Sequence, residues 1–114
     1  MDKCNESGHT AILNKLKNSC IFDDGVAAAS KMFSLLGEEN RMKIVLALAE
    51  GELCVYHLCD ITGGKQSATS QHLRKLKDGG IIKCRKEGNL VLYSLLDEHV
   101  ITIVKTALKH TKCH

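Results

Sequence analysis

Apolar residues recur every three or four positions along most of this chain, which is the spacing of helices with one buried face. Gly37, Gly51 and the pair Gly79-Gly80 interrupt the pattern at points where helices would end. Between these breaks the pattern is regular enough to define separate elements. The predicted helices cover residues 10–19, 26–36, 39–50, 55–61, 66–77 and 97–112.

The pattern changes from helical to strand spacing after Gly80. Residues 81–86 and 90–94 are short apolar or β-branched runs that flank Glu87-Gly88-Asn89. Such a pair of runs around a short turn predicts a β-hairpin. The resulting order, five helices, two strands and a last helix, predicts a mainly α fold with a β-hairpin wing, the winged helix-turn-helix.

The last helix carries more apolar side chains than one face can hold. A stripe this broad exceeds what a monomer of this size can cover, so we expect a second subunit to bury part of it. The prediction is a homodimer formed through the terminal helices. The apolar residues are Val100, Ile101, Ile103, Val104, Ala107 and Leu108.

Length and composition favour one domain. The 114 residues can bury one modest core. We expect an N-terminal arm with a short helix over residues 1–23 and the winged helix-turn-helix domain over residues 24–114. The first residues lack the apolar segment of a signal peptide, and no apolar run approaches the roughly 20 residues that span a bilayer. These features, with six cysteines that suit ligands or buried thiols, predict a cytoplasmic protein with no membrane partner.

The helix over residues 66–77 is predicted to read DNA. Thr69, Leu73 and Leu76 fall at i, i+4 and i+7, which makes one buried stripe. The side chains off this stripe are of the kinds that contact base edges and phosphates. The open alternative is a solvated amphipathic helix in a small bundle. The predicted DNA-contacting residues of this helix are Gln66, Ser67, Ser70, Gln71, Arg74 and Lys75.

The charge is concentrated around this helix. The net charge is +3, but Lys65 to Lys86 contain seven basic residues and one acidic residue, a local charge of +6. A basic block around a reading helix suits double-stranded DNA. Lys83, Arg85 and Lys86 would then form a basic wing able to touch a phosphate backbone or minor groove.

Three motifs follow one another along the chain: Glu52-Leu53-Cys54-Val55, the run from Ser70 to Leu76 with Gly79-Gly80-Ile81, and Tyr93-Ser94-Leu95 with Asp97-Glu98-His99. With these motifs in this order, residues 24–114 resemble the ArsR/SmtB family of bacterial metal-sensing repressors. The resemblance implies a winged-helix homodimer that binds operator DNA without metal and releases it when metal binds. Lys65 stands where the resemblance implies a Ser helix cap.

The last helix carries the most specific set of candidate metal ligands in the sequence: Asp97, His99, His110 and either Cys113 or His114. His99 and His110 lie close to three turns apart on one face, but about 16 Å separates the two ends, so one ion cannot join them within a chain. An antiparallel last helix from a second subunit would bring the two halves together. The resemblance implies the same arrangement in zinc-sensing members. The expected effector is Zn(II), with Cd(II) or another soft or borderline divalent metal as alternatives. The alternative to a metal site is an exposed polar helix end with no ligand.

A second candidate metal site combines Cys54 and His57, at i and i+3, with Cys4 and His9 of the arm. The resemblance implies that some members bind metal between this helix and the arm of the other subunit. Two cysteines and two histidines suit Zn(II) or Cd(II). The alternative is a free arm with Cys54 as a buried thiol.

The predicted function is therefore a metal-responsive repressor. The first rival is a repressor of the same fold that senses oxidants or trivalent arsenic through Cys54, Cys59 or Cys113. An enzyme is disfavoured because the sequence offers no general base beside an open metal position and no phosphate-cradling loop.

Overall fold

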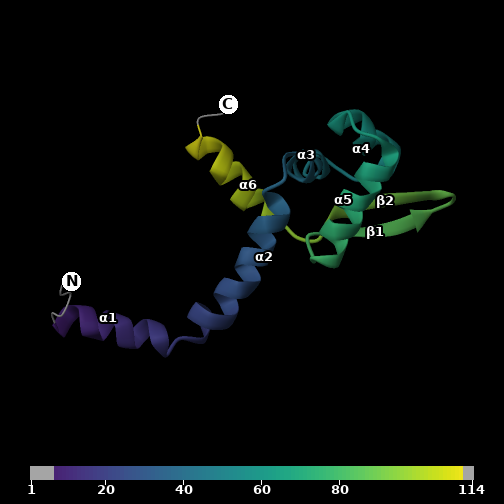
Figure 1. The fold of residues 1–114 in the computed structure, drawn as a ribbon. Coiled ribbons are helices and arrows are strands. Elements are labelled where there is room, and N and C mark those ends of the chain that lie inside the picture. Colours follow the sequence, from purple (N-terminus) through teal and green to yellow (C-terminus); the bar gives the residue numbers. More distant parts are fainter. Residues whose placement is uncertain (1–6, 112–114) are drawn as a thin grey trace. The chain divides into compact units, whose positions relative to one another are not determined.

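The structure is a computed structural model that describes residues 7–111, with the order of elements that the sequence predicts (Figure 1). Cys4, Cys113 and His114 of the two candidate metal sites lie outside the described residues. The chain divides into two compact units, residues 1–31 and 32–114. The division falls within helix α2, Val26–Leu36.

The first unit contains helix α1, Ser7–Lys17, and a single π-helical turn, η1, Ile21–Gly25, that leads directly into α2. Its large apolar side chains are exposed; Ile12 is 56% and Ile21 is 72% exposed. None of residues 8–31 is buried, so the described part of this unit forms no core of its own.

The second unit holds the core. Helix α3, Glu39–Leu48, contributes Ile44, Val45 and Leu48 to it, as predicted. The Glu38 side chain caps α3 by accepting a hydrogen bond from the Arg41 backbone N–H at 2.8 Å. Every element of this unit gives at least one buried side chain or partly buried apolar contact to the cluster. The buried members are Leu36, Ile44, Val45, Leu48, Leu58, Leu73, Leu76, Ile81, Ile82, Val100 and Val104.

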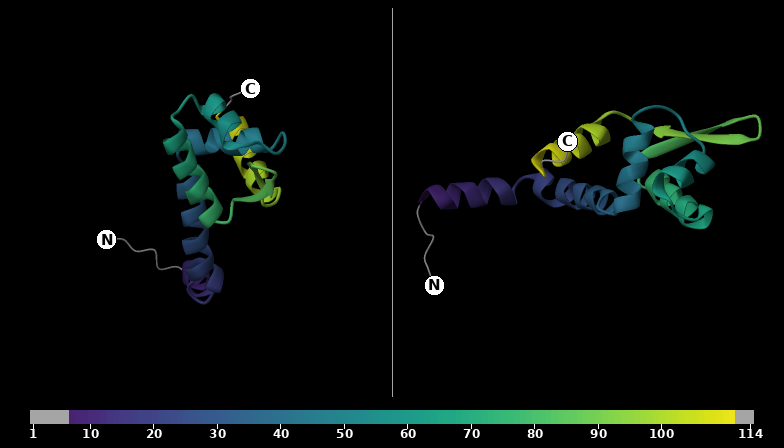
Figure 2. Two further views of the ribbon diagram at one scale, coloured as in Figure 1. Left: turned by 90° about the vertical axis from the view of Figure 1, so that its right-hand side faces the viewer. Right: turned by 90° about the horizontal axis from the view of Figure 1, so that it is seen from above.

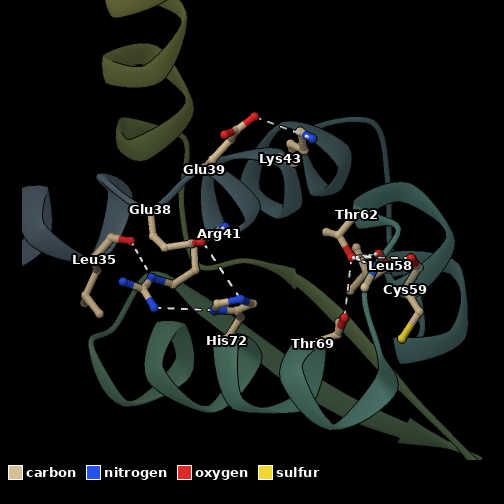
Figure 3. Close-up of polar contacts among 11 residues, drawn as sticks. Leu35, Glu38, Glu39, Arg41, Lys43, Leu58, Cys59, Thr62, Thr69 and His72 are labelled. Carbon is tan, nitrogen blue, oxygen red and sulfur yellow. Dashed lines mark hydrogen bonds and ion pairs between the residues drawn. The ribbon is translucent and has the colours of Figure 1, made fainter.

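Helices α4, Val55–Thr62, and α5, Gln66–Asp78, form the helix-turn-helix. The turn begins at Gly63, whose φ of +72° is the left-handed conformation that ends many helices. Lys65 is the N-cap of α5 but makes no side-chain cap bond. The Thr62 hydroxyl ties the turn together instead: it donates to the Leu58 carbonyl at 3.1 Å and lies 3.5 Å from the Thr69 hydroxyl (Figure 3).

Strands β1, Ile82–Glu87, and β2, Leu90–Leu95, form the predicted antiparallel hairpin. It extends beyond α4 and α5 as a wing (Figure 2). Leu53 pairs with Tyr93 through two backbone hydrogen bonds of 3.2 and 2.8 Å. The segment that leads into α4 is therefore attached to the sheet at the base of the wing.

Helix α6, His99–His110, begins two residues later than predicted. Val100 and Val104 are buried, while Ile103 is half-buried and Ala107 is exposed. The chain thus covers only part of the apolar stripe by itself. Across the described residues, no helix combines the length and the apolar character that crossing a bilayer requires.

Candidate nucleic-acid interface and metal ligands

Helix α5 is held by its apolar stripe, and its polar face is turned to solvent. Thr69, Leu73 and Leu76 are each 1% exposed or less, as predicted. Burying this stripe leaves the opposite side chains free to meet the edges of bases in a major groove. All six predicted DNA-contacting residues of this helix are exposed: Gln66, Ser67, Ser70, Gln71, Arg74 and Lys75.

A polar depression of about 270 Å³ lies between α5 and β2. Arg74 and Lys77 supply two positive charges, Ser70 and Tyr93 supply hydroxyls, and Asp78 supplies one negative charge. Burial raises the pKa of Tyr93, Cys84 adds to the rise, and Lys77 opposes it. The Tyr93 hydroxyl therefore keeps its proton at neutral pH, and the depression offers hydrogen-bond donors and positive charge to a phosphate.

Lys77 and Tyr93 are functional candidates that the sequence pattern does not single out. Lys77 follows the reading face by one turn, and Tyr93 lies in a strand whose pattern reads only as core. The depression that joins them depends on where the fold places Tyr93 of β2 relative to α5. The one sequence signal for this depression is the basic character of residues 74–77.

The three basic residues of the wing differ in their surroundings. Lys83 and Lys86 are exposed. Arg85 donates two hydrogen bonds to the Glu52 carboxylate, at 2.7 and 2.8 Å, and lies 3.4 Å from Glu87. The hydrogen bond from Arg85 lowers the pKa of Glu52, and the same bond raises the pKa of Arg85. Arg85 is therefore engaged within the chain, where it joins the wing to the segment before α4.

The structure places the predicted ligands of the last helix at its two ends. Asp97 Oδ1 accepts a hydrogen bond from the His99 backbone N–H at 2.9 Å and lies 3.2 Å from His99 Nδ1. The His99 side chain is 89% exposed. His110 is exposed at the other end of α6, about 16 Å away by helix geometry.

One described chain therefore carries predicted metal ligands at both ends of α6, too far apart to share an ion. Nowhere between residues 7 and 111 do three or more His, Cys, Asp or Glu side chains come together as a metal site. The paired oxygen and imidazole donors of Asp97 and His99 nevertheless suit zinc or cadmium, and both side chains are open to a second chain.

The structure brings together Cys54 and His57 of the second candidate site. Cys54 Sγ lies 3.4 Å from His57 Nδ1 at the start of α4. The thiol is buried and the imidazole is exposed. His9 is exposed in α1, which belongs to the other unit.

A winged helix-turn-helix with an exposed polar reading helix and a basic depression beside it defines a DNA-binding protein. Comparison with known proteins agrees with this class. Residues 38–83 match the family described as bacterial regulatory protein, arsR family. The chain belongs to the ArsR family and is a transcriptional repressor of the ArsR/SmtB type, not an enzyme.

Individual relatives support this assignment. The cadmium resistance transcriptional regulatory protein CadC homolog of Staphylococcus aureus is 46% identical over 84 residues, which are 73% of this chain and 69% of that protein. The HTH-type transcriptional repressor SmtB of Mycobacterium tuberculosis is 39% identical over 73% of this chain and 62% of its own length. A homodimeric winged helix-turn-helix domain from Mycobacterium bovis matches with a TM-score of 0.72 and 26% identity over 85% of this chain and 94% of that one.

Proposed function

We propose that this chain is a metal-responsive repressor that binds operator DNA as a homodimer and leaves it when Zn(II) or Cd(II) binds. The observation that carries the metal part is the contact between Asp97 and His99 at the exposed start of α6. The cadmium-resistance name of the Staphylococcus relative supports it. We place the protein in the bacterial cytoplasm, with residues 1–23 as an arm and residues 24–114 as the working domain.

The apolar surface of α2 and α6 supports the dimer. An apolar depression of about 100 Å³ lies beside α6, and its lining includes Phe33, Ile103 and Ala107. Phe33 is 55% exposed. A second copy related by a two-fold axis would cover these side chains. The similar Mycobacterium bovis domain is described as homodimeric.

In such a dimer, Asp97 and His99 of one chain would hold the ion together with His110 and either Cys113 or His114 of the other. Bound there, the ion would cross-link the two last helices. These ligands must lose protons before they bind metal, so we expect the affinity for metal to fall as the solution becomes more acidic. A Cys113 ligand would favour Zn(II) or Cd(II) over harder ions.

On the DNA side, the two copies of α5 would enter successive major grooves about 34 Å apart. Gln71 and Arg74 would face base edges, while the depression at Lys77 and Tyr93 would take a backbone phosphate. Lys83 and Lys86 of the wing would meet the flanking backbone. A dimer geometry imposed by metal would then change the spacing of the two reading helices, and metal and DNA would weaken each other equally.

The contact between Cys54 and His57 supports a second candidate function. Cysteine sulfur and imidazole nitrogen are both ligands that zinc and cadmium accept, and cysteine sulfur is also the atom that oxidants attack. This pair could join Cys4 and His9 in a second metal site. It could also make the protein a repressor that responds to oxidants or trivalent arsenic.

A zinc titration of the reduced protein on labelled promoter DNA, read by anisotropy, tests the proposal. We expect tight binding in chelator and a loss of about tenfold or more as roughly one zinc per subunit is added. His99→Ala and His110→Ala should bind DNA but ignore zinc, while Cys54→Ser should respond as the wild type does. If the histidine variants still release DNA on zinc addition and Cys54→Ser does not, the second candidate function replaces the first.

A further inference from the structure

The end of α2 is linked to the reading helix at two separate places, through Arg41 of α3 at one and directly at the other. The Leu35 backbone carbonyl accepts a hydrogen bond from Arg41 Nε at 2.7 Å, and Arg41 Nη1 lies 3.4 Å from Nδ1 of His72 on α5 (Figure 3). The Leu35 side chain reaches the other place, the C-cap of α5. A Cβ atom added to Gly79 would overlap Leu35 Cδ1. We call these four residues, Leu35, Arg41, His72 and Gly79, the α2–α5 joint.

In the polar half of the joint, the donor and the acceptor of the hydrogen bond are defined. A guanidinium only donates hydrogen bonds, so His72 Nδ1 must accept, and the ring proton lies on Nε2. Nε2 faces Glu38 Oε1 at 3.9 Å. Glu38 is itself held by the Arg41 backbone N–H, which lowers its pKa. His72 is therefore held between one cation and one carboxylate of α3, with a side chain 19% exposed.

The apolar half of the joint is a close steric fit. Gly79 has a φ of −83°, which any L residue adopts, so its backbone does not need a glycine. What excludes a larger residue there is the Leu35 side chain. A Cβ at residue 79 would therefore require the Leu35 side chain to move, and it would also lie 3.2 Å from the Lys75 backbone carbonyl oxygen.

These contacts do what the buried stripe of α5 does not. Apolar burial is non-directional, so Thr69, Leu73 and Leu76 fix which face of α5 is inward more firmly than they fix its position along its own axis. A hydrogen bond at the middle of α5 and a steric contact at its end restrict that sliding. Leu35 also precedes Leu36 and Gly37, which line the apolar depression beside α6.

We infer that Leu35 is a positioning residue, which sets the placement of the reading helix through Arg41 and His72 at one point and through Gly79 at another. The inference rests on the proposed DNA-binding function. It adds the contacts through which a structural change at the apolar surface of α2 and α6 would alter the position of α5. Arg41 and His72 are positioning residues in the same sense.

A double-mutant cycle tests the steric half. Gly79→Ala should weaken operator binding about tenfold, because the new methyl must displace Leu35 or α5. Adding Leu35→Ala makes room, so the double variant should bind within about threefold of Leu35→Ala alone. Gly8→Ala, where a Cβ meets nothing within 4 Å, is the matched control and should change nothing.

The polar half is tested by a conservative rescue. His72→Leu cannot accept from Arg41 and should weaken operator binding, while His72→Gln can accept and should restore most of it. Both variants keep a side chain of similar size, so a difference between them reports hydrogen bonding at this position and not side-chain volume. If Leu and Gln at this position bind the operator equally, Arg41 and His72 do not position α5.

Amide hydrogen exchange of α5 in the free protein provides the readout that does not depend on DNA. Exchange should quicken in Gly79→Ala and return toward the Leu35→Ala level in the double variant. Additive effects in both readouts would overturn the inference. If the wild type bound no operator, the proposed function would have failed, and the exchange cycle would still decide whether Leu35 places α5.

Discussion

The reading helix and the last helix differ in how much of a site a single chain can build. Around α5, one chain supplies a buried stripe, a polar face, and a depression completed by Tyr93 of the wing. Along α6, one chain supplies Asp97 and His99 at one end and His110 at the other, too far apart to share an ion. A protein built this way can meet DNA with each subunit separately, but it can bind the proposed metal only as a pair. The need for a partner is what would let metal act on the spacing of the reading helices.

Among substitutions in the reading helix, Arg74→Ala should have the largest effect on operator binding. Arg74 is exposed on the polar face of α5 and also lines the depression, so its loss should weaken operator binding by about tenfold to a hundredfold. Fluorescence anisotropy on promoter DNA measures this. Lys43→Ala removes the same charge from α3, where the lysine pairs with Glu39 at 3.8 Å, and serves as control. Equal losses in the two variants would mean that α5 is not the reading surface.

Lys77→Ala and Tyr93→Phe should have smaller and distinguishable effects. Loss of a phosphate-contacting lysine should reduce the slope of log affinity against log salt by about one, while loss of the tyrosine hydroxyl should leave that slope unchanged. Both variants should bind a few times more weakly than the wild type. Lys105→Ala on α6 is the control for charge. An unchanged slope for Lys77→Ala would remove the depression from the DNA interface.

Glu52→Gln and Arg85→Ala should have similar, modest effects on the wing. Their ion pair is exposed, so we expect each variant to weaken operator binding by about threefold at most. Amide exchange at Leu53 and Tyr93 should quicken in both, because the pair holds that edge of the sheet. If Glu52→Gln slowed exchange or left it unchanged while Arg85→Ala weakened binding strongly, Arg85 would act on DNA and not on the wing.

The smallest effect should be the acid sensitivity contributed by Glu38. Its pKa lies below the ordinary 4.5 because the Arg41 backbone N–H donates to it. A carboxyl with a lowered pKa stabilises the fold above its unfolded pKa, and this stability is lost as the pH falls through the folded value. Thermal unfolding between pH 6 and about pH 3 should therefore be less steeply pH-dependent in Glu38→Gln than in the wild type. Parallel curves for the two proteins would contradict this role for Glu38.

The sequence predicts the reading helix and the hairpin well because the signals for these elements are local. The i, i+4, i+7 spacing of Thr69, Leu73 and Leu76 identifies the buried side of α5, and two apolar runs around Gly88 identify the hairpin. The signal that determines where α6 starts is less local. Asp97 resembles a helical residue by its position, but its side chain accepts from the His99 N–H, and the helix begins at His99.

Contacts between distant parts of the chain are what the sequence does not predict. Arg85 reads as a basic wing residue until Glu52, 33 positions earlier, is found beside it. The roles inferred for Gly79 and His72 depend in the same way on Leu35 and Arg41. Glycine at position 79 reads as a helix stop, and only the packed structure shows that Leu35 occupies the space of its missing side chain.

The most direct test of the proposed shared metal site mixes two inactive variants. His99→Ala and His110→Ala should each form dimers that bind the operator and ignore zinc. A mixed dimer would pair the intact Asp97 and His99 of one chain with the intact His110 of the other, giving one complete site in about half of all dimers. We predict that mixing the two proteins restores zinc-dependent release from promoter DNA, with about one zinc per mixed dimer. A mixture as indifferent to zinc as its two components would contradict a site shared between subunits.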